Sequence, residues 1–156
     1  MDNITTQIID ILNAINSAYV ALYNANTTFN FSTSGVDGFR NLIEQRNMVA
    51  EDLDVLANRL LSVMRSQCKE KGLPCANLID AINSAPSLET ASQAACDTIK
   101  NSLQQLVDSD LVIEQAISVL KDDIKAELGR VRKGARSLRS YMTPDNLGSC
   151  FVNKIR

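Results

Sequence analysis

Three stretches of this 156-residue chain carry apolar side chains at alternating spacings of four and three residues. This spacing places the apolar residues on one face of an α-helix. In a half-buried β-strand, apolar residues would instead recur at every second position. The first stretch comprises Ile4, Ile8, Ile11, Ile15, Ala18 and Leu22. The second comprises Phe39, Leu42, Arg46, Val49, Leu53, Leu56, Leu60, Val63 and Gln67. The third comprises Leu88, Ala91, Ala95, Ile99, Leu103, Leu106, Asp110, Ile113, Ile117, Leu120, Ile124, Leu128 and Val131.

The fold class follows from these three stretches. The chain is 45% hydrophobic but only 4% aromatic, and it has six Gly and three Pro. Such a composition fits long helices packed through Leu, Ile, Val and Ala. We therefore expect an all-α fold, an elongated antiparallel helical hairpin or bundle with coiled-coil-like heptad packing of three to four helices.

The segments between the stretches predict where the helices end. Residues 24–38, rich in Asn, Ser, Thr and Gly, are expected to form a connection. The sequence KEKGLPC, with Gly72 and Pro74, predicts the end of the second helix. A short helix is expected at 75–85, and Ser87 is a candidate N-cap for the third long helix.

Two charged residues interrupt the apolar spacing. For Arg46 we expect the aliphatic part to pack and the guanidinium to reach solvent, the alternative being a role in partner binding. Asp110 indicates either a bend, with Ser109 or Asp110 capping a new helix, or one continuous helix. We favour the continuous helix because the apolar spacing resumes in phase beyond Asp110.

Charge divides the chain near residue 129. Residues 1–128 contain nine bases and seventeen acids, whereas residues 129–156 contain seven bases and one acid. We therefore predict a helical bundle domain at 1–128 and a basic C-terminal tail at 129–156. Gly129 and Gly134 each cost a helix about 1 kcal/mol relative to Ala, so the tail is expected to be marginally helical.

The tail is open to three interpretations. It is a frayed helix end, an amphipathic helix that docks on a partner, or a site for nucleic-acid phosphates. We favour partner binding, because the chain has few aromatic residues for base stacking and its acidic body would repel nucleic acid. The expected contact residues are the apolar Val131, Leu138, Tyr141 and Met142, with Arg132, Arg136 and Arg139 around them.

Residue types needed for chemistry are scarce. The chain has no His, no glycine-rich phosphate loop and no C-x-x-C pair, so we expect no catalytic residues, no metal site, no cofactor and no enzymatic activity. Its four cysteines are expected to be reduced, the alternative being a Cys68–Cys75 disulfide under oxidising conditions. With no signal peptide or membrane-spanning run expected, the sequence predicts a cytoplasmic protein that does not insert into membranes.

The order of these segments resembles a family of export chaperones. It is carried by FRNLIEQRNMVAEDLDVLANRL, then KEKGLPCANLIDAINSAP, then LQQLVDSDLVIEQAISVLKDDIKAEL. This layout is similar to the FlgN family of flagellar export chaperones and, more loosely, to the FliT group. The clearest points of likeness are GLP at 72–74 and VIEQAISVL at 112–120. Asp108 and Asp110 stand where the family usually has Asn.

The resemblance implies a function without catalysis. Members of this family are small, all-helical cytoplasmic proteins that bind the C-terminal regions of hook–filament junction proteins before export. They also engage the flagellar type III export apparatus, and their C-terminal helical region contributes to binding. On this chain that region holds the contact residues expected from the tail. The alternative function is a coiled-coil adaptor or scaffold that forms a permanent dimer, and oligomerisation is possible under either function.

Overall fold

The computed structural model describes residues 3–141, except for the side chains at positions 31, 32 and 141. Within this range the regular structure is entirely helical, which confirms the predicted all-α class. The α-helices are α1 (Asn3–Thr28), α2 (Phe31–Lys71), α3 (Leu78–Leu88) and α4 (Gln93–Tyr141), and a 3₁₀ turn, η1 (Thr90–Ser92), precedes α4. The chain divides into two compact units, Met1–Ile113 and Glu114–Arg156, and α4 contributes residues to both.

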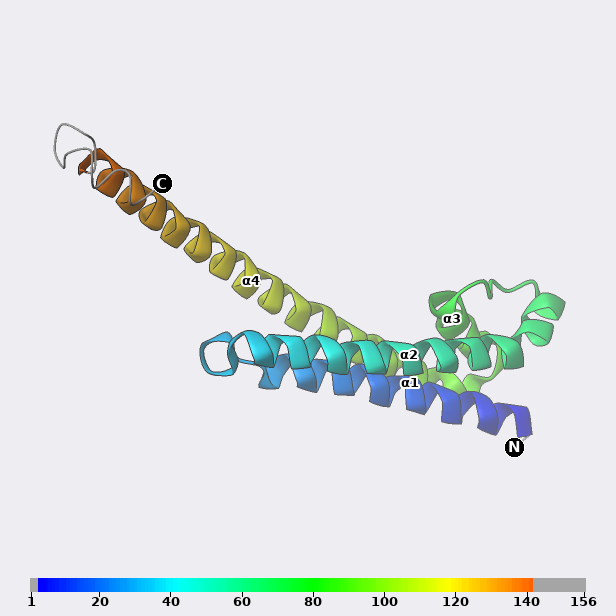
Figure 1. Ribbon diagram of the computed structural model, residues 1–156. Coiled ribbons are helices and arrows are strands. Elements are labelled where there is room, and N and C mark those ends of the chain that lie inside the picture. Colours follow the sequence, from blue (N-terminus) through cyan, green and yellow to red (C-terminus); the bar gives the residue numbers. More distant parts are fainter. Residues whose placement is uncertain (1–2, 142–156) are drawn as a thin grey trace. The chain divides into compact units, whose positions relative to one another are not determined.

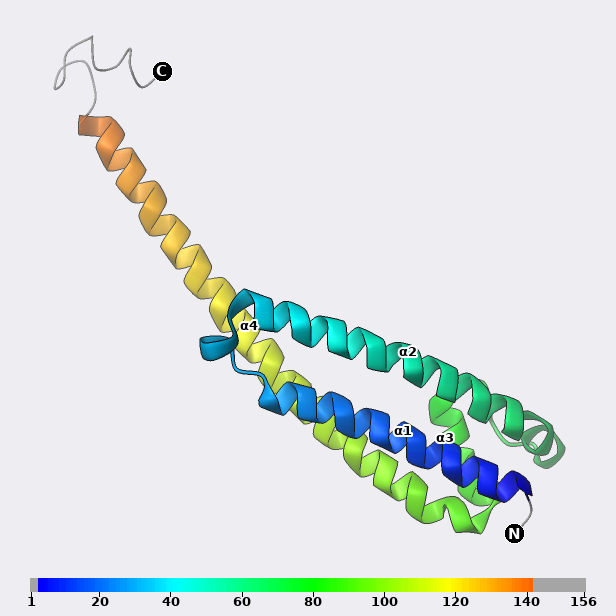
Figure 2. The same ribbon diagram turned by 60° about the horizontal axis from the view of Figure 1, so that its bottom comes forward.

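In the first unit, three helices lie side by side. α1 and α2 run in opposite directions, as both views show (Figure 1 and Figure 2). The part of α4 before Ile113 runs parallel to α1. Ser102 of α4 donates a hydrogen bond of 2.7 Å to Asn16 of α1, and Asn26, further along α1, donates one of 2.9 Å to Ser109, further along α4.

The hydrophobic core lies where all four α-helices of the first unit meet. Each helix contributes two or more fully buried side chains, so the core ties together segments from Ile8 to Ile99. Its members are Ile8, Ile11, Leu12, Ile15, Leu60, Met64, Cys68, Ala81, Ile82, Ala85, Cys96 and Ile99. Beyond Leu60, the buried positions of α2 are Met64 and Cys68, whereas the predicted Val63 and Gln67 are half-buried. A straight helix drifts by about 20° per heptad, which moves the buried face to the next residue.

The expected connection at 24–38 is wrong for most of its length. α1 continues to Thr28, and α2 begins at Phe31. The Thr28 hydroxyl donates to the Asn24 carbonyl at 2.8 Å, so this polar side chain is compatible with the last turn of α1. α2 contains a kink at Gly35, whose φ of 60° is accessible to glycine at little cost.

The predicted end of the second helix is confirmed. Gly72 has a φ of 66°, and the Leu73 amide donates to the Cys68 carbonyl at 2.8 Å, as in a Schellman C-cap. α3 then begins after Asn77, whose side chain accepts a hydrogen bond of 2.9 Å from the Asp80 amide. The expected N-cap at Ser87 is wrong, because this residue lies in the last turn of α3 and η1 precedes α4.

α4 is one continuous helix through Asp110, as the resumed apolar spacing predicted. In the second unit, every residue from Ser118 to Ser140 is exposed, although the helix continues through Gly129 and Gly134. The structure also divides between Ile113 and Glu114, fifteen residues before the change in charge. Among residues 3–141, no helix combines the length and apolar character required to cross a membrane.

Candidate interaction surface

The second unit carries a line of exposed apolar side chains along α4. We call this line the α4 stripe, and it comprises the half-buried Ile117 and the exposed Leu120, Ile124, Leu128, Val131, Ala135 and Leu138. At 100° per residue these seven positions fall within an arc of roughly 80°. The large side chains of the stripe from Leu120 to Leu138 are 43% to 60% exposed. Exposed leucines and isoleucines are common singly, but a continuous line of them indicates an interaction surface.

The predicted contact residues lie on or beside this stripe. Val131 and Leu138 belong to it, and Arg132, Arg136 and Arg139 are exposed along one flank. Tyr141 is the last residue of α4, and its side chain is not described. Met142 lies outside the described residues. The structure therefore describes the side chains of five of the seven predicted residues, and all five are exposed on one helix.

The first half of the stripe was not predicted as a contact surface. Leu120, Ile124 and Leu128 were expected to pack within the helical bundle domain at 1–128, but all three are exposed. In the described residues, the core ends before them, since the last buried side chain on α4 is Leu106. Periodicity identifies the apolar face of a helix but does not say whether a second helix covers it, so no local signal separated these residues from buried ones.

Charge changes sign along the second unit. Residues 114–127 contain four acids and two bases, whereas residues 128–141 contain five bases and no acid. Glu127 and Arg130 form an ion pair of 3.0 Å near the change. Both side chains are largely exposed, so this pair contributes little to stability. The remaining charges of the second half are available to a partner.

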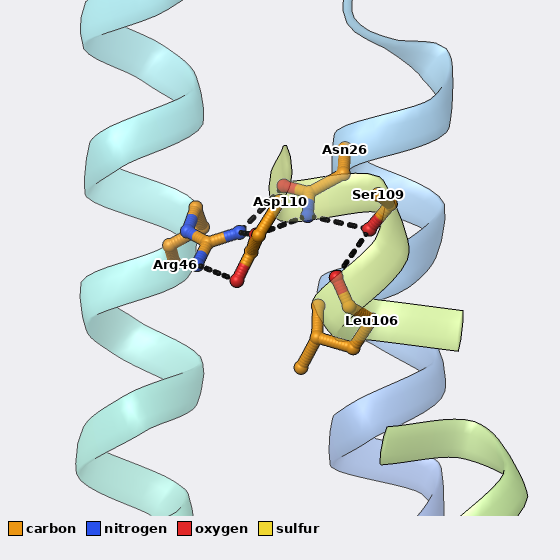
Figure 3. A network of polar contacts seen from close by, with 5 residues as sticks. All are labelled: Asn26, Arg46, Leu106, Ser109 and Asp110. Atoms are coloured by element: carbon orange, nitrogen blue, oxygen red, sulfur yellow. Dashed lines mark hydrogen bonds and ion pairs between the residues drawn. The ribbon is translucent and has the colours of Figure 1, made fainter. Parts of the chain in front are cut away.

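A polar network lies in the first unit, at the end of α1 (Figure 3). Arg46 of α2 bonds Asp110 of α4 through both carboxylate oxygens, at 2.7 and 3.3 Å. Arg46 also donates to Asn26 of α1 at 2.6 Å, and the Asn26 amide donates to Asp110 at 2.6 Å. Ser109 accepts a second hydrogen bond from Asn26 and donates to the Leu106 carbonyl at 2.8 Å. The network therefore joins α1, α2 and α4.

The expectation that the guanidinium of Arg46 simply reaches solvent is wrong. It is paired with the other residue that interrupts an apolar stretch, Asp110. A signal for this pair was present in the sequence. Arg46 and Asp110 carry opposite charges, and each interrupts the apolar spacing of one of two helices that were expected to pack together. Asn26 had no such signal, because it lies in the polar segment assigned to a connection, yet it is only 4% exposed.

The first unit also contains an apolar groove between α1 and α2. Its volume is about 300 Å³, and it is lined by Ala21, Leu22, Ala25, Gln45, Met48, Val49 and Asp52. The groove contains one carboxylate and one amide but no pair of converging ionisable groups. It offers apolar contact and no arrangement for proton transfer.

The described cysteines are free thiols. Burial raises the pKa of Cys68 to about 11, assisted by a hydrogen bond with Cys75 and by the charge that Cys75 would carry. Burial also raises the pKa of Cys96. Both buried thiols therefore stay protonated near neutral pH, which makes them poor nucleophiles. Within residues 3–141, no three His, Cys, Asp or Glu side chains are grouped to bind a metal ion.

Comparison with known proteins gives no family assignment. No protein-family model, no curated protein and no solved structure matches the chain.

Proposed function

We propose that this protein is a non-enzymatic chaperone that binds an amphipathic helical segment of a client protein on the α4 stripe. The observation that supports it best is the continuous line of exposed apolar side chains on a helix with no covering element in the described second unit. Together with the sequence resemblance, this favours a cytoplasmic flagellar type III export chaperone of the FlgN and FliT kind. Its clients would be the C-terminal regions of hook–filament junction proteins, which it would deliver to the export apparatus and keep from assembling prematurely.

The size of the stripe is adequate for reversible binding. Fully burying an exposed Leu, Ile or Val contributes about 1.5 to 3 kcal/mol, and these side chains are already about half-buried. Six such residues can offset part of the entropy lost when a disordered segment becomes ordered. The result is compatible with micromolar affinity, about −8 kcal/mol, which permits later release to the export apparatus.

The charges around the stripe specify the client further. In the second half of the unit, Arg132, Arg136 and Arg139 flank the apolar residues. A client helix with acidic residues beside its apolar face would complement them, and a basic one would be repelled. We therefore propose that the client segment is apolar on one face and acidic on its flanks.

Titration calorimetry with C-terminal segments of junction proteins tests this proposal. We expect micromolar binding by the full chain and at least tenfold weaker binding after Ile124→Asp, because a charge would have to be buried against the client. The matched control is Val119→Asp, at an apolar residue that is also exposed but lies outside the stripe. Equal weakening by both variants, or no binding by the unmodified chain, would contradict the proposal.

A truncation defines the contribution of the predicted tail. A chain ending at Leu128 keeps Ile117, Leu120, Ile124 and Leu128 but loses the arginines and the apolar residues beyond them. We expect it to bind the same segments several-fold more weakly and with less dependence on salt concentration. Binding equal to that of the full chain would remove the tail from the site.

A further inference from the structure

We infer that the α4 stripe is also a self-association site, at which residues 114–141 of two copies of this chain pair in antiparallel orientation. This inference concerns the free protein and does not depend on the proposed client. It rests on three features of the second unit: exposure of the stripe, the spacing of its apolar residues and the separation of its charges.

The first feature is the exposure of the apolar side chains of the α4 stripe. Every residue from Ser118 to Ser140 is exposed, and the large side chains of the stripe from Leu120 to Leu138 leave about half of their surface to solvent. A second amphipathic helix laid along the stripe would cover the large apolar residues from Ile117 to Leu138. These 22 residues rise over roughly 30 Å.

The spacing of the apolar residues suits an antiparallel partner. The three positions in the first half are Ile117, Leu120 and Ile124, separated by three and then four residues. The three positions in the second half are Val131, Ala135 and Leu138, separated by four and then three residues. The order of spacings is therefore the same from either end, and Leu128 lies near the centre. When two copies lie antiparallel, the apolar residues of one helix therefore lie opposite those of the other along the helix axis.

The separation of charges selects the orientation. In antiparallel pairing, residues 114–127 of each copy, with four acids and two bases, lie against residues 128–141 of the other, with five bases and no acid. In parallel pairing the two basic halves would lie against each other and repel. Opposite charges thus attract at both ends of an antiparallel pair. The client of the proposed function would then compete with the second copy for the same stripe.

Sedimentation equilibrium of the full chain, without any client, tests self-association. We expect a concentration-dependent monomer–dimer equilibrium in which Ile124→Asp raises the dissociation constant by tenfold or more and Val119→Asp changes it less than about threefold. Circular dichroism serves to show that both variants keep the helix content of the unmodified chain. A protein that stays monomeric up to hundreds of micromolar, or a dimer weakened equally by the two variants, would overturn the inference.

Two further measurements test the orientation. Raising the salt concentration is expected to weaken an antiparallel dimer, since it screens attraction between opposite charges, and would strengthen a parallel one. A benzophenone amino acid replacing Leu138 in the full chain is expected to crosslink to residues 114–121 of the second copy. Crosslinks confined to residues 135–142 would instead establish parallel pairing and contradict the inference. Loss of client binding with self-association intact would contradict only the proposed function.

Discussion

Asp110 and Arg46 show how two charged residues can be retained inside an apolar helical bundle. Each is about one-third exposed, and their bond is completed by Asn26, which is almost fully buried. The hydrogen bonds among these three residues form only when α1, α2 and α4 are aligned at the observed level. A polar layer of this kind adds little stability compared with apolar packing, but it disfavours helices shifted by a turn.

A double-mutant cycle at this pair measures the coupling. Asp110→Leu leaves the buried Asn26 amide and the Arg46 guanidinium short of an acceptor, so we expect a loss of about 1 to 3 kcal/mol in the free energy of unfolding. Combining it with Arg46→Met is expected to cost at least about 0.5 kcal/mol less than the sum of the two single changes. Denaturant unfolding provides the values. The exposed Glu127–Arg130 pair is the control, with an expected coupling below about 0.5 kcal/mol; additive effects at Arg46 and Asp110 would contradict the role of the network.

The thiol of Cys68 makes stability depend on pH in the alkaline range. Its pKa is raised to about 11 by burial first and by Cys75 second, whereas in the unfolded chain it ionises near 9.0. Between these values the unfolded chain loses the proton first, so the free energy of unfolding falls as pH rises from about 9 to 11, by about 2 kcal/mol. Below pH 9 this contribution is constant.

Comparison of the unmodified chain with Cys68→Ala isolates this effect from other groups that titrate at high pH. We expect the variant to be less stable at pH 7 but to lose less of its stability between pH 9 and 11. Cys75→Ala should reduce the pH dependence only in part, because burial of Cys68 is the larger cause. Identical pH profiles for the unmodified chain and Cys68→Ala would show that Cys68 is not protected from ionisation.

At the scale of elements, glycines have opposite effects in α2 and α4. Gly72 ends α2 with a φ of 66°, a conformation that costs other residues about 1 to 2 kcal/mol. Gly129 lies within α4, and a methyl group added there would meet nothing within 4 Å. Replacing glycine by alanine should therefore destabilise the end of α2 at Gly72 and stabilise α4 at Gly129.

We expect Gly72→Ala to lower the free energy of unfolding of the first unit by about 1 kcal/mol. Gly129→Ala is expected to stabilise the helix in the second unit by about the same amount, because alanine has the higher helix propensity. Amide hydrogen exchange distinguishes the two, since it reports each segment separately. The prediction for Gly129 fails if exchange at residues 125–135 is unchanged or faster in the variant.

At the scale of the whole molecule, the two units derive their order from different sources. In the first, twelve buried side chains from four helices form one core, so tertiary packing supports each helix. The described part of the second has exposed residues almost throughout, so its helix relies on local propensity, which is marginal for a single helix in water. A partner that covers the α4 stripe, whether a client or a second copy, would supply the missing packing.

Several features of this protein could be predicted from local sequence alone. The all-α class, the end of α2 at Gly72 and the continuity of α4 through Asp110 depend on residue spacing and on the backbone preferences of glycine and proline. Val131 and Leu138 could be placed together on the apolar face of a basic segment because their spacing is helical and arginines occupy another face. These are properties of short segments, and neighbouring residues determine them.

Other features were decided only by tertiary structure. The pairing of Arg46 with Asp110, the burial of Asn26 and the exposure of Leu120, Ile124 and Leu128 depend on which helix faces which, over separations of many residues. The spacing of apolar residues is enough to locate the apolar face of each helix. Which of those faces is covered depends on how far the neighbouring helices extend, because the hydrophobic effect is nondirectional and does not select a partner by local sequence.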